Sequence, residues 1–335
     1  MHDLPKNIIS IQPQSNALDH LSIAILIPCF NEAVAIASVI DGFKTHLPSA
    51  TVYVYDNNST DATLTIAKQH GAIVRSVSYQ GKGYVVRQMF ADIDADVYVL
   101  VDGDATYHAP SAFEMIHHQQ MHQIDMVVGV RQNKEQHAYR AGHQFGNRLL
   151  TGCVNFIFGR VFTDILSGYR VFSRRFVKSF PALSRGFEIE TELSVHALAL
   201  SLPVSEIKTP YFARPEGSFS KLSTYRDGWR ILKMIVRLFR SEKPLAFFGL
   251  IAVILTAVAV ILAIPLLATY WETGLVPRQP TAVLTVGLIT LSAISLACGF
   301  ILDTVTQGRK EQKRLAYLAV GSHKISHQHT HNDKL

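Results

Sequence analysis

The chain has 335 residues, 48% of them hydrophobic and 17% charged, and its formal net charge is +6; this length accommodates one domain of ordinary size and a further element. The positive charge does not indicate nucleic-acid binding, because the basic residues gather beside two apolar segments and in loops suited to phosphate, where attraction to anionic membrane lipids accounts for them. The three cysteines, Cys29, Cys153 and Cys298, are odd in number and far apart, which indicates neither a disulfide framework nor a metal cluster.

Residues 1–20 lack the apolar core of a signal peptide, so we expect the large domain that follows to stay in the cytosol. Short apolar or alternating runs predict strands at residues 22–27, 51–55, 73–77, 97–101 and 126–130. Segments with helical spacing lie between them, at residues 33–43, 62–70, 84–91 and 110–122. Strands that alternate with helices form βαβ units and a mainly parallel sheet. We therefore predict an α/β domain over residues 21–222.

The strand at residues 97–101 runs directly into Asp102, Gly103 and Asp104. The carboxyl end of a buried strand is where an α/β sheet binds ligands. Two carboxylates at this edge suit Mg²⁺ or Mn²⁺, which proteins commonly share with substrate phosphates. Gly103 lets the backbone approach the ligand closely. The alternative is a strand followed by an ordinary Asp-Gly turn.

The neighbouring strand ends carry side chains that suit a nucleotide diphosphate. Asp56 can accept hydrogen bonds from a base or a ribose, and Lys82 and Arg131 can meet phosphate. The alternatives are that residues 56–61 only cap a helix and that Lys82 is a solvated lysine in a glycine turn. The sequence has no Gly-x-x-x-x-Gly-Lys-Ser/Thr loop and no Gly-x-Gly-x-x-Gly after the first strand, which disfavours phosphate-loop hydrolases and dinucleotide oxidoreductases.

The second half of the domain supplies further arginines and acids. A helix is predicted over residues 140–162, and Arg131, Arg140 and Arg170 have guanidinium groups that can clasp phosphate oxygens. Glu190 lies at the acidic start of another predicted helix, where it is either a functional residue or a complement to the helix dipole.

Residues 214–222 combine Arg214, a glycine and serine run, and Lys221. Such a loop can close over a diphosphate or an acceptor phosphate. The alternative is a basic linker of ordinary loop composition.

The C-terminal third predicts a membrane anchor. Residues 245–270 and 281–302 contain no charged residue, and each exceeds the roughly 20 residues that cross a bilayer. Basic residues flank the pair on both outer sides, so the positive-inside rule places both termini in the cytoplasm. We predict a two-helix hairpin over residues 244–303, an amphipathic helix on the cytoplasmic leaflet at residues 223–243, and a basic, histidine-containing cytoplasmic tail at residues 304–335.

Six motifs follow one another along the chain: Pro28-Cys29-Phe30-Asn31-Glu32, Asp56-Asn57-Asn58-Ser59-Thr60-Asp61, Gly81-Lys82-Gly83, Asp102-Gly103-Asp104, Gly129-Val130-Arg131 and Thr163-Asp164-Ile165-Leu166-Ser167-Gly168-Tyr169-Arg170. They occur in the order seen in glycosyltransferase family 2, and the chain resembles the polyprenyl-phosphate branch of that family over residues 21–305. The resemblance implies a GT-A fold, a nucleotide-sugar donor, a divalent metal at the Asp-x-Asp motif, and inversion at the anomeric carbon.

Carried over by position, the resemblance implies that Pro28, Glu32 and Asp56 line the nucleoside pocket. It also implies that Asp102 and Asp104 serve the ribose and the metal, with Asp104 as the direct metal ligand.

The resemblance further implies that Arg131 meets the acceptor phosphate together with a nearby arginine and a small polar partner. Arg140 and Asn147 are the candidates here, and Arg170 and Ser220 join them as acceptor-phosphate residues. Because a polyprenyl phosphate is already an anion, we assign Asp164 an orienting role and not that of a general base.

These expectations predict an inverting, metal-dependent glycosyltransferase that uses undecaprenyl or dolichyl phosphate in the cytoplasmic membrane. A UDP-linked glucose or N-acetylglucosamine is the expected donor, and GDP-mannose is the alternative. An inert membrane scaffold is the alternative from another class, and intact Asp102, Asp104, Lys82 and Lys221 speak against it. A processive polysaccharide synthase is disfavoured because the Gln-x-x-Arg-Trp motif is absent and two spans are too few for a channel. The sequence leaves the oligomeric state, including a homo-oligomer, open.

Overall fold

The computed structural model describes residues 18–133, 141–159, 161–184, 186, 188–215 and 224–321. Its centre is a seven-stranded sheet in the order β3-β2-β1-β4-β6-β5-β7. The strands are β1 (Ile23–Cys29), β2 (Thr51–Asp56), β3 (Ile73–Ser76), β4 (Val97–Leu100), β5 (Met126–Asn133), β6 (Arg170–Ser173) and β7 (Val204–Tyr211).

The sheet is mainly parallel, as predicted. Strands β1 to β4 pair in parallel, and so do β5 and β7. Strand β6 is the exception, because it runs antiparallel to both β4 and β5. The carboxyl ends of β1, β2, β4, β5 and β7 therefore lie at one edge of the sheet, where the chain that leads into β6 also arrives.

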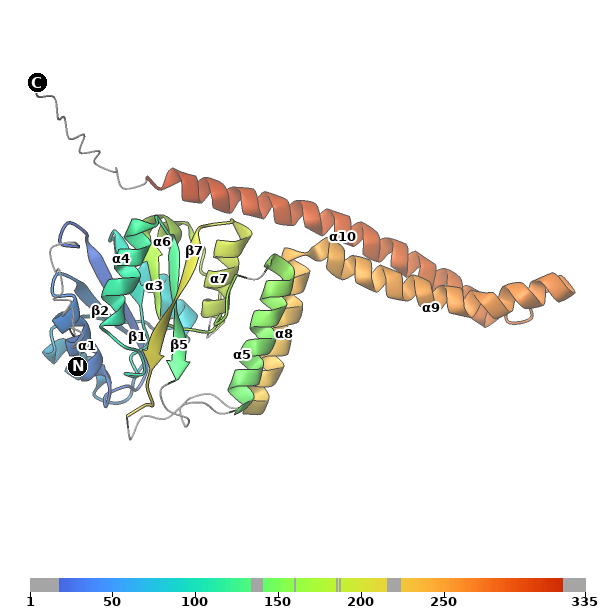
Figure 1. Ribbon diagram of the computed structural model, residues 1–335. Coiled ribbons are helices and arrows are strands. Elements are labelled where there is room, and N and C mark those ends of the chain that lie inside the picture. The colour runs from blue at the N-terminus through green and yellow to red at the C-terminus, as the bar shows by residue number, and fades with distance from the viewer. Residues whose placement is uncertain are drawn as a thin grey trace, which may run out of the picture.

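Helices cover both faces of the sheet, which explains why its central strands are continuously apolar (Figure 1). Alternate residues of β1 and β4 enter opposite cores. Ile25 and Val99 pack in the core that includes α1 (Ile36–His46) and α4 (Ser111–Met121). Leu26 packs in the core that includes α3 (Lys82–Asp92) and α7 (Ile189–Ala199). Two short helices complete this domain, α2 (Thr63–Gln69) and α6 (Arg174–Ser179).

Helix α3 begins two residues earlier than the sequence predicts, at Lys82. The preceding Gly81 has φ 138°, a conformation that side-chain-bearing residues rarely adopt, and it turns the chain directly into the helix. This turn is fixed by Asn57, whose Oδ1 accepts a hydrogen bond from Gly81 N at 2.6 Å and whose Nδ2 donates to Tyr79 O at 2.8 Å. The end of β2 thereby positions Lys82.

Four long helices lie to one side of the sheet domain, beyond α7 (Figure 1). Helices α5 (Ala141–Phe158) and α8 (Thr224–Glu242) lie side by side. Helices α9 (Pro244–Thr273) and α10 (Gln279–Ala319) form a hairpin that projects from the domain, and each is long and apolar enough to cross a membrane. Helix α10 extends beyond the predicted span and returns to the sheet domain.

The returning end of α10 docks on the domain through polar contacts. Tyr317 OH donates to Asp125 Oδ2 at 2.9 Å, and the Arg175 guanidinium lies 4.8 Å from the centre of the Tyr317 ring. Arg175 also donates to Val320 O at 3.2 Å. The first part of the predicted tail is thus helical, while its histidine-containing part lies outside the described residues.

Small residues join the two helices of the hairpin. The buried residues of α10 are Thr285, Ser292, Gly299 and Thr306, which recur every seven positions. Ser292 Oγ donates to Ala252 O of α9 at 2.9 Å. A Cβ atom at Gly299 would lie 3.2 Å from Phe248 Cβ. Small residues let the two backbones approach closely, which is typical of packing between membrane helices.

Candidate active site

A cavity of about 270 Å³ opens at the carboxyl edge of the sheet. Seven of the predicted site residues line it: Pro28, Glu32, Lys82, Asp102, Gly103, Asp104 and Arg214. They come from β1 and the loop that follows it, from the start of α3, from the loop after β4 and from the segment after β7. Residues that are as many as 186 positions apart in the chain therefore meet at this edge.

Asp56 ends β2, is 2% exposed and precedes Asn57, which lines the cavity. Its Oδ2 accepts a hydrogen bond from Ser59 N at 3.0 Å, which is the turn contact that the sequence indicates. Its Oδ1 is buried and has no hydrogen-bond partner within the described part of the chain. A buried carboxylate oxygen without a partner is costly, so this atom is suited to receive a donor from a ligand.

Lys82 bridges two carboxylates. Its Nζ lies 2.5 Å from Asp102 Oδ1 and 2.5 Å from Glu190 Oε1, the latter on α7. Burial opposes the charge on Lys82, but the attraction of Asp102 and Glu190 outweighs it and raises the pKa of the ammonium group. Burial raises the pKa of Glu190, against the attraction of Lys82. Glu190 is therefore connected to the cavity through its ion pair with Lys82.

Asp104 is 3% exposed and is held from two sides. Its Oδ1 accepts a hydrogen bond from Thr106 Oγ1 at 2.6 Å, and its Oδ2 lies 2.7 Å from Arg214 Nη2. Burial, together with the charge of Asp102, raises the pKa of Asp104, while Arg214 opposes this shift.

The donor set fits a hard divalent cation. Asp102 and Asp104 both line the cavity, and carboxylate oxygens are the ligands that Mg²⁺ and Mn²⁺ prefer. Within the described ranges, no group of three or more His, Cys, Asp and Glu residues is arranged to hold a metal. Such a cation would accordingly take its remaining ligands from water and substrate phosphates, which is common for Mg²⁺.

A second polar cluster joins Arg131, Asp164 and Asn147, from β5, the loop before β6, and α5. Arg131 Nε and Nη2 lie 2.7 Å from Asp164 Oδ2 and Oδ1, respectively, and Asn147 Nδ2 donates to Asp164 Oδ1 at 2.9 Å. Burial alone would raise the pKa of Asp164, but the hydrogen bonds and charge of Arg131, helped by Asn147, hold it below its ordinary value. A carboxylate with a lowered pKa is a weak base, which suits an orienting role.

The two clusters meet at Gly168. A Cβ atom there would lie 2.5 Å from Asp102 Oδ2, so any larger residue would force the Asp102 carboxylate to move from its place against the turn that follows Asp164. Gly168 N also donates to Tyr107 OH at 2.8 Å. The sequence does not reveal this contact, because its two sides are 66 positions apart.

The prediction that Arg170 contacts the acceptor phosphate is wrong. Its side chain is 0% exposed, because Arg170 begins β6 and points into the protein. The guanidinium donates to Ser167 O at 2.9 Å, to Ile165 O at 2.6 Å and to Ser194 Oγ at 2.9 Å. Arg170 thus braces the turn that carries Gly168. Arg140, Ser220 and Lys221, which were also expected to contact phosphate, lie outside the described residues.

Several contacts at the site were not predicted. Thr106 holds Asp104 through its hydroxyl and, more weakly, through its backbone N at 3.2 Å. An aspartate that bonds the residue two positions later is a common turn, so the Asp-x-Thr sequence is a usable signal. Glu206 of β7 accepts hydrogen bonds from the backbone of Thr163 and Asp164, at 2.8 and 3.2 Å. No local pattern marks Glu206.

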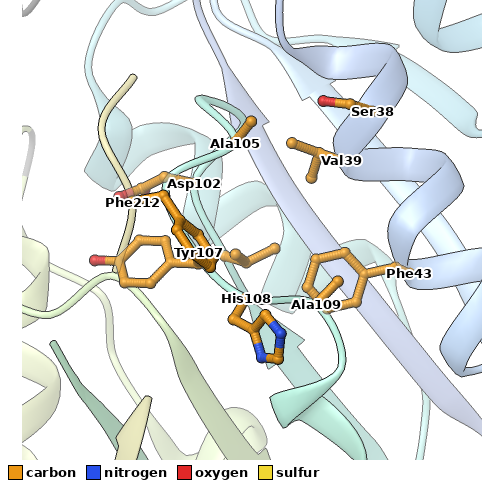
Figure 2. A pocket seen from close by; sticks show the side chains of 10 residues that line it. Ser38, Val39, Phe43, Asp102, Ala105, Tyr107, His108, Ala109 and Phe212 are labelled. Atoms are coloured by element: carbon orange, nitrogen blue, oxygen red, sulfur yellow. The ribbon is translucent and has the colours of Figure 1, made fainter. Parts of the chain in front are cut away.

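A smaller cavity, of about 200 Å³, lies beside the first and shares Asp102 with it (Figure 2). Its walls come from α1, from the loop after Asp104 and from Phe212. Tyr107, His108 and Phe212 are among its aromatic residues. Phe212 N donates to Thr106 O at 2.9 Å, which fastens the segment that carries Arg214 to the loop that carries Asp104.

Comparison with known proteins identifies the family. The family model described as glycosyl transferase family 2 matches residues 24–180. Glycosyltransferase AglJ of Haloferax volcanii is 33% identical over 295 residues, which are 88% of this chain and 96% of AglJ. A dolichyl-phosphate hexose transferase of the same organism is 25% identical over 224 residues, which are 66% of this chain and 95% of that protein.

The fold also resembles solved structures. Glucosyl-3-phosphoglycerate synthase from Mycobacterium tuberculosis, solved in complex with Mn²⁺ and uridine-diphosphate-glucose, gives a TM-score of 0.53. The two proteins are 22% identical, and the match covers 67% of this chain and 80% of the other. This likeness confirms the predicted fold class.

Proposed function

The chain belongs to glycosyltransferase family 2, and from this membership we propose that it transfers a sugar from a nucleotide sugar to a polyprenyl phosphate. The observation that carries the proposal is the cavity in which Asp102, Asp104, Lys82 and Arg214 meet. Two carboxylates and two positively charged side chains in one cavity suit a diphosphate that binds together with a divalent cation.

The proposed donor is a UDP-linked hexose, glucose or N-acetylglucosamine, with GDP-mannose as the alternative. Pro28 and Glu32 line the cavity and would contact the nucleoside. The buried Oδ1 of Asp56, which lacks a partner among the described residues, would accept a hydrogen bond from the base or the ribose. The solved relative that binds uridine-diphosphate-glucose with Mn²⁺ supports a donor and a metal of this kind.

We assign the metal to Asp104, with Asp102 as a second ligand. When bound, Mg²⁺ or Mn²⁺ would supply positive charge that offsets the charge developing on the leaving diphosphate. Lys82 would hold Asp102 in place, and Arg214 would meet the diphosphate oxygens.

The proposed acceptor is undecaprenyl or dolichyl phosphate, and the relative named dolichyl-phosphate hexose transferase supports an acceptor of this kind. The acceptor phosphate would be recognised by Arg131 and Asn147, which Asp164 orients. The phosphate needs no general base, because it is already ionised at neutral pH. An attack on the face opposite the leaving diphosphate would invert the anomeric carbon, so an α-linked donor would give a β-linked lipid monophosphosugar.

The C-terminal helices suit a lipid acceptor. Helix α8 packs Met234, Ile235 and Leu238 around Leu150 and Val154 of α5. On its other side α8 exposes Leu232 and Val236 beside Lys233, Arg237 and Arg240, a mixture suited to an anionic membrane surface. Helix α9 follows directly, so α8 would lie on the cytoplasmic leaflet while α9 and α10 span the inner membrane.

The proposal is tested with the full-length protein in detergent. Undecaprenyl or dolichyl phosphate, Mg²⁺ or Mn²⁺, and a panel of UDP- and GDP-sugars are supplied, and lipid-linked products are identified by mass spectrometry. We expect one donor to give a lipid monophosphosugar only when the metal is present. The Asp104→Asn variant should remain folded and lose nearly all turnover. Metal-dependent activity that survives this substitution contradicts the metal assignment, and transfer to no lipid contradicts the proposed acceptor.

A further inference from the structure

Helix α10 continues well beyond its apolar segment. The uncharged residues end at position 302 and the helix ends at Ala319, so about 25 Å of helix lie beyond the span at 1.5 Å per residue. The buried or half-buried side chains of this extension follow one another at steps of three or four and include Thr306, Lys310, Lys313, Tyr317 and Val320. One face of the extension therefore lies against the rest of the protein.

The sheet domain and the hairpin are joined by a break in the helical backbone. Helix α8 ends at Glu242 and α9 begins at Pro244, and Lys243 between them has φ −135° and ψ 58°. Helix α8 packs against α5 and the loop before β6, so it moves with the sheet domain. The rings of Phe239 and Phe247 pack edge to face across the break, with centres 5.8 Å apart. Rotation of the sheet domain relative to the hairpin would take place at Lys243.

Helix α10 spans this break and holds both sides of it. Close to the break, Ser241 O accepts hydrogen bonds from Thr306 Oγ1 at 3.2 Å and from Arg309 Nη2 at 2.9 Å. Eleven positions further along α10, about 16 Å at the helical rise, Tyr317 contacts the sheet domain. A contact far from a pivot resists rotation more effectively than one close to it. The contact at Tyr317 is therefore the one that best fixes the orientation of the sheet domain.

The sheet domain offers Tyr317 a well-built partner. Asp125 is 5% exposed, and its two carboxylate oxygens accept hydrogen bonds from Tyr317 OH at 2.9 Å and from Ser173 Oγ at 2.5 Å. The Arg175 guanidinium covers the Tyr317 ring and donates to Val320 O at 3.2 Å. A buried carboxylate that loses a donor is costly, so the contact is specific to a hydroxyl at this position.

This contact lies at the edge of the sheet opposite the active site. Asp125 immediately precedes β5, and Ser173 ends the antiparallel β6, so both mark the amino ends of the parallel strands. Figure 1 shows the end of α10 passing the sheet domain on the side away from the β5 arrowhead. Helix α10 thus holds the domain without covering the cavity at the carboxyl edge.

We propose that residues 306–320 of α10 form a strut that fixes the orientation of the sheet domain on the membrane, with Tyr317 as its positioning residue. The inference rests on the proposed lipid acceptor and extends it to how that acceptor is reached. The phosphate of a membrane lipid is confined to the bilayer surface, so the cavity must meet it in one orientation, and misplaced reacting groups slow a reaction strongly. A water-soluble acceptor approaches the cavity freely and does not need this orientation.

The kinetic test uses the full-length protein in lipid vesicles, with metal and donor held constant. Undecaprenyl phosphate in the vesicles is compared with a short, water-soluble isoprenyl phosphate. Tyr317→Ala removes both the hydroxyl and the ring, and Tyr317→Phe removes the hydroxyl alone. Leu318→Ala is the matched control, because the neighbouring Leu318 is 59% exposed and lies on the same turn of α10.

We expect Tyr317→Ala to lower kcat/KM for the vesicle-bound acceptor about tenfold, because the reacting groups are no longer held in register. With the soluble acceptor, kcat/KM should stay within about twofold of the unmodified protein. Tyr317→Phe keeps the ring under Arg175 and should lose less than Tyr317→Ala. Leu318→Ala should match the unmodified protein with both acceptors.

A second measurement reports the orientation without any turnover. Spin labels are attached at Met121→Cys on α4 and Leu267→Cys on α9, both exposed positions, after Cys153 and Cys298 have been replaced by alanine. Double electron–electron resonance then gives the distribution of distances between the sheet domain and the hairpin in vesicles. We expect a narrow distribution, which Tyr317→Ala broadens and Leu318→Ala leaves unchanged.

The outcomes separate the inference from the proposed function. If Tyr317→Ala leaves the distance distribution narrow, the strut is wrong. If the distribution broadens but transfer to the vesicle-bound acceptor is unchanged, or if transfer to both acceptors falls equally, Tyr317 does not position the domain for the lipid. If the unmodified protein modifies neither acceptor, the proposed function fails and takes the role in acceptor access with it, while the distance measurement still decides whether α10 fixes the domain.

Discussion

Arg131 and Asp164 form a two-pronged ion pair, with two guanidinium nitrogens each 2.7 Å from a different carboxylate oxygen. Both side chains are largely buried. Removing one partner of such a pair leaves the other charge without compensation, which typically destabilises a protein by about 3–5 kcal/mol.

Asp164→Asn should therefore lower the unfolding temperature of the full-length protein at neutral pH. The folded-state pKa of Asp164 is depressed, so its stabilising effect is present above the ordinary aspartate pKa and is lost as pH falls through the folded value. The difference in unfolding temperature between the two proteins should be constant near neutrality and should shrink in acid. Thermal unfolding followed by intrinsic fluorescence across a pH series measures it. A difference that persists unchanged in acid contradicts the ionised pair.

Lys82 separates the carboxylates of Asp102 and Glu190, which would otherwise face each other. We expect Lys82→Met to destabilise the protein by about 3 kcal/mol, because the buried Glu190 and the partly exposed Asp102 lose their shared counter-ion. Glu190→Gln should cost less, since Lys82 keeps Asp102. The double variant Lys82→Met/Glu190→Gln has lost one of the two acids together with their counter-ion. The changes in unfolding free energy caused by the two substitutions should therefore not add, with a coupling of about 1–3 kcal/mol. Additive changes in the free energy of unfolding would show that Glu190 does not act through Lys82.

Substitution of Arg170 tests whether this arginine has a structural role or binds the acceptor phosphate. Arg170→Met should lower the unfolding temperature, because the carbonyls of Ser167 and Ile165 lose buried hydrogen bonds worth about 1–3 kcal/mol each. The KM for the lipid phosphate should stay within about twofold at a temperature where the variant is folded, a free-energy change of only about 0.4 kcal/mol. Arg131→Met is the comparison, and its KM should rise. A large rise in KM for Arg170→Met would restore the original assignment.

Much of the site could be predicted because its signals are local. Asp102 and Asp104 follow an apolar strand directly, and Asp56 ends another, so the rule that strand ends meet at one edge was sufficient to bring them together. Contacts between distant segments could not be predicted. Lys82 and Glu190 are 108 positions apart, and the local sequence around neither residue indicates that the two are in contact.

Two strands were not predicted, each for a physical reason of its own. Strand β6 is four residues long and starts with an arginine, and β7 mixes polar and apolar residues because it lies at the edge of the sheet. Arg170 was misassigned as a consequence. In a loop its guanidinium would be available to phosphate, whereas at the start of β6 it is buried against backbone carbonyls.

The hairpin gives a prediction with a control in the same helix. Gly299 of α10 faces α9, where an added Cβ atom would lie 3.2 Å from Phe248 Cβ, whereas an added Cβ atom at Gly287 would meet nothing within 4 Å. Gly299→Leu should push the helices apart and lower the unfolding temperature in detergent, since small residues allow the close packing. Gly287→Leu should not lower it, because leucine favours a helix more than glycine does. Equal effects of the two substitutions would mean that the face containing Gly299 does not pack against α9 in the detergent-solubilised protein.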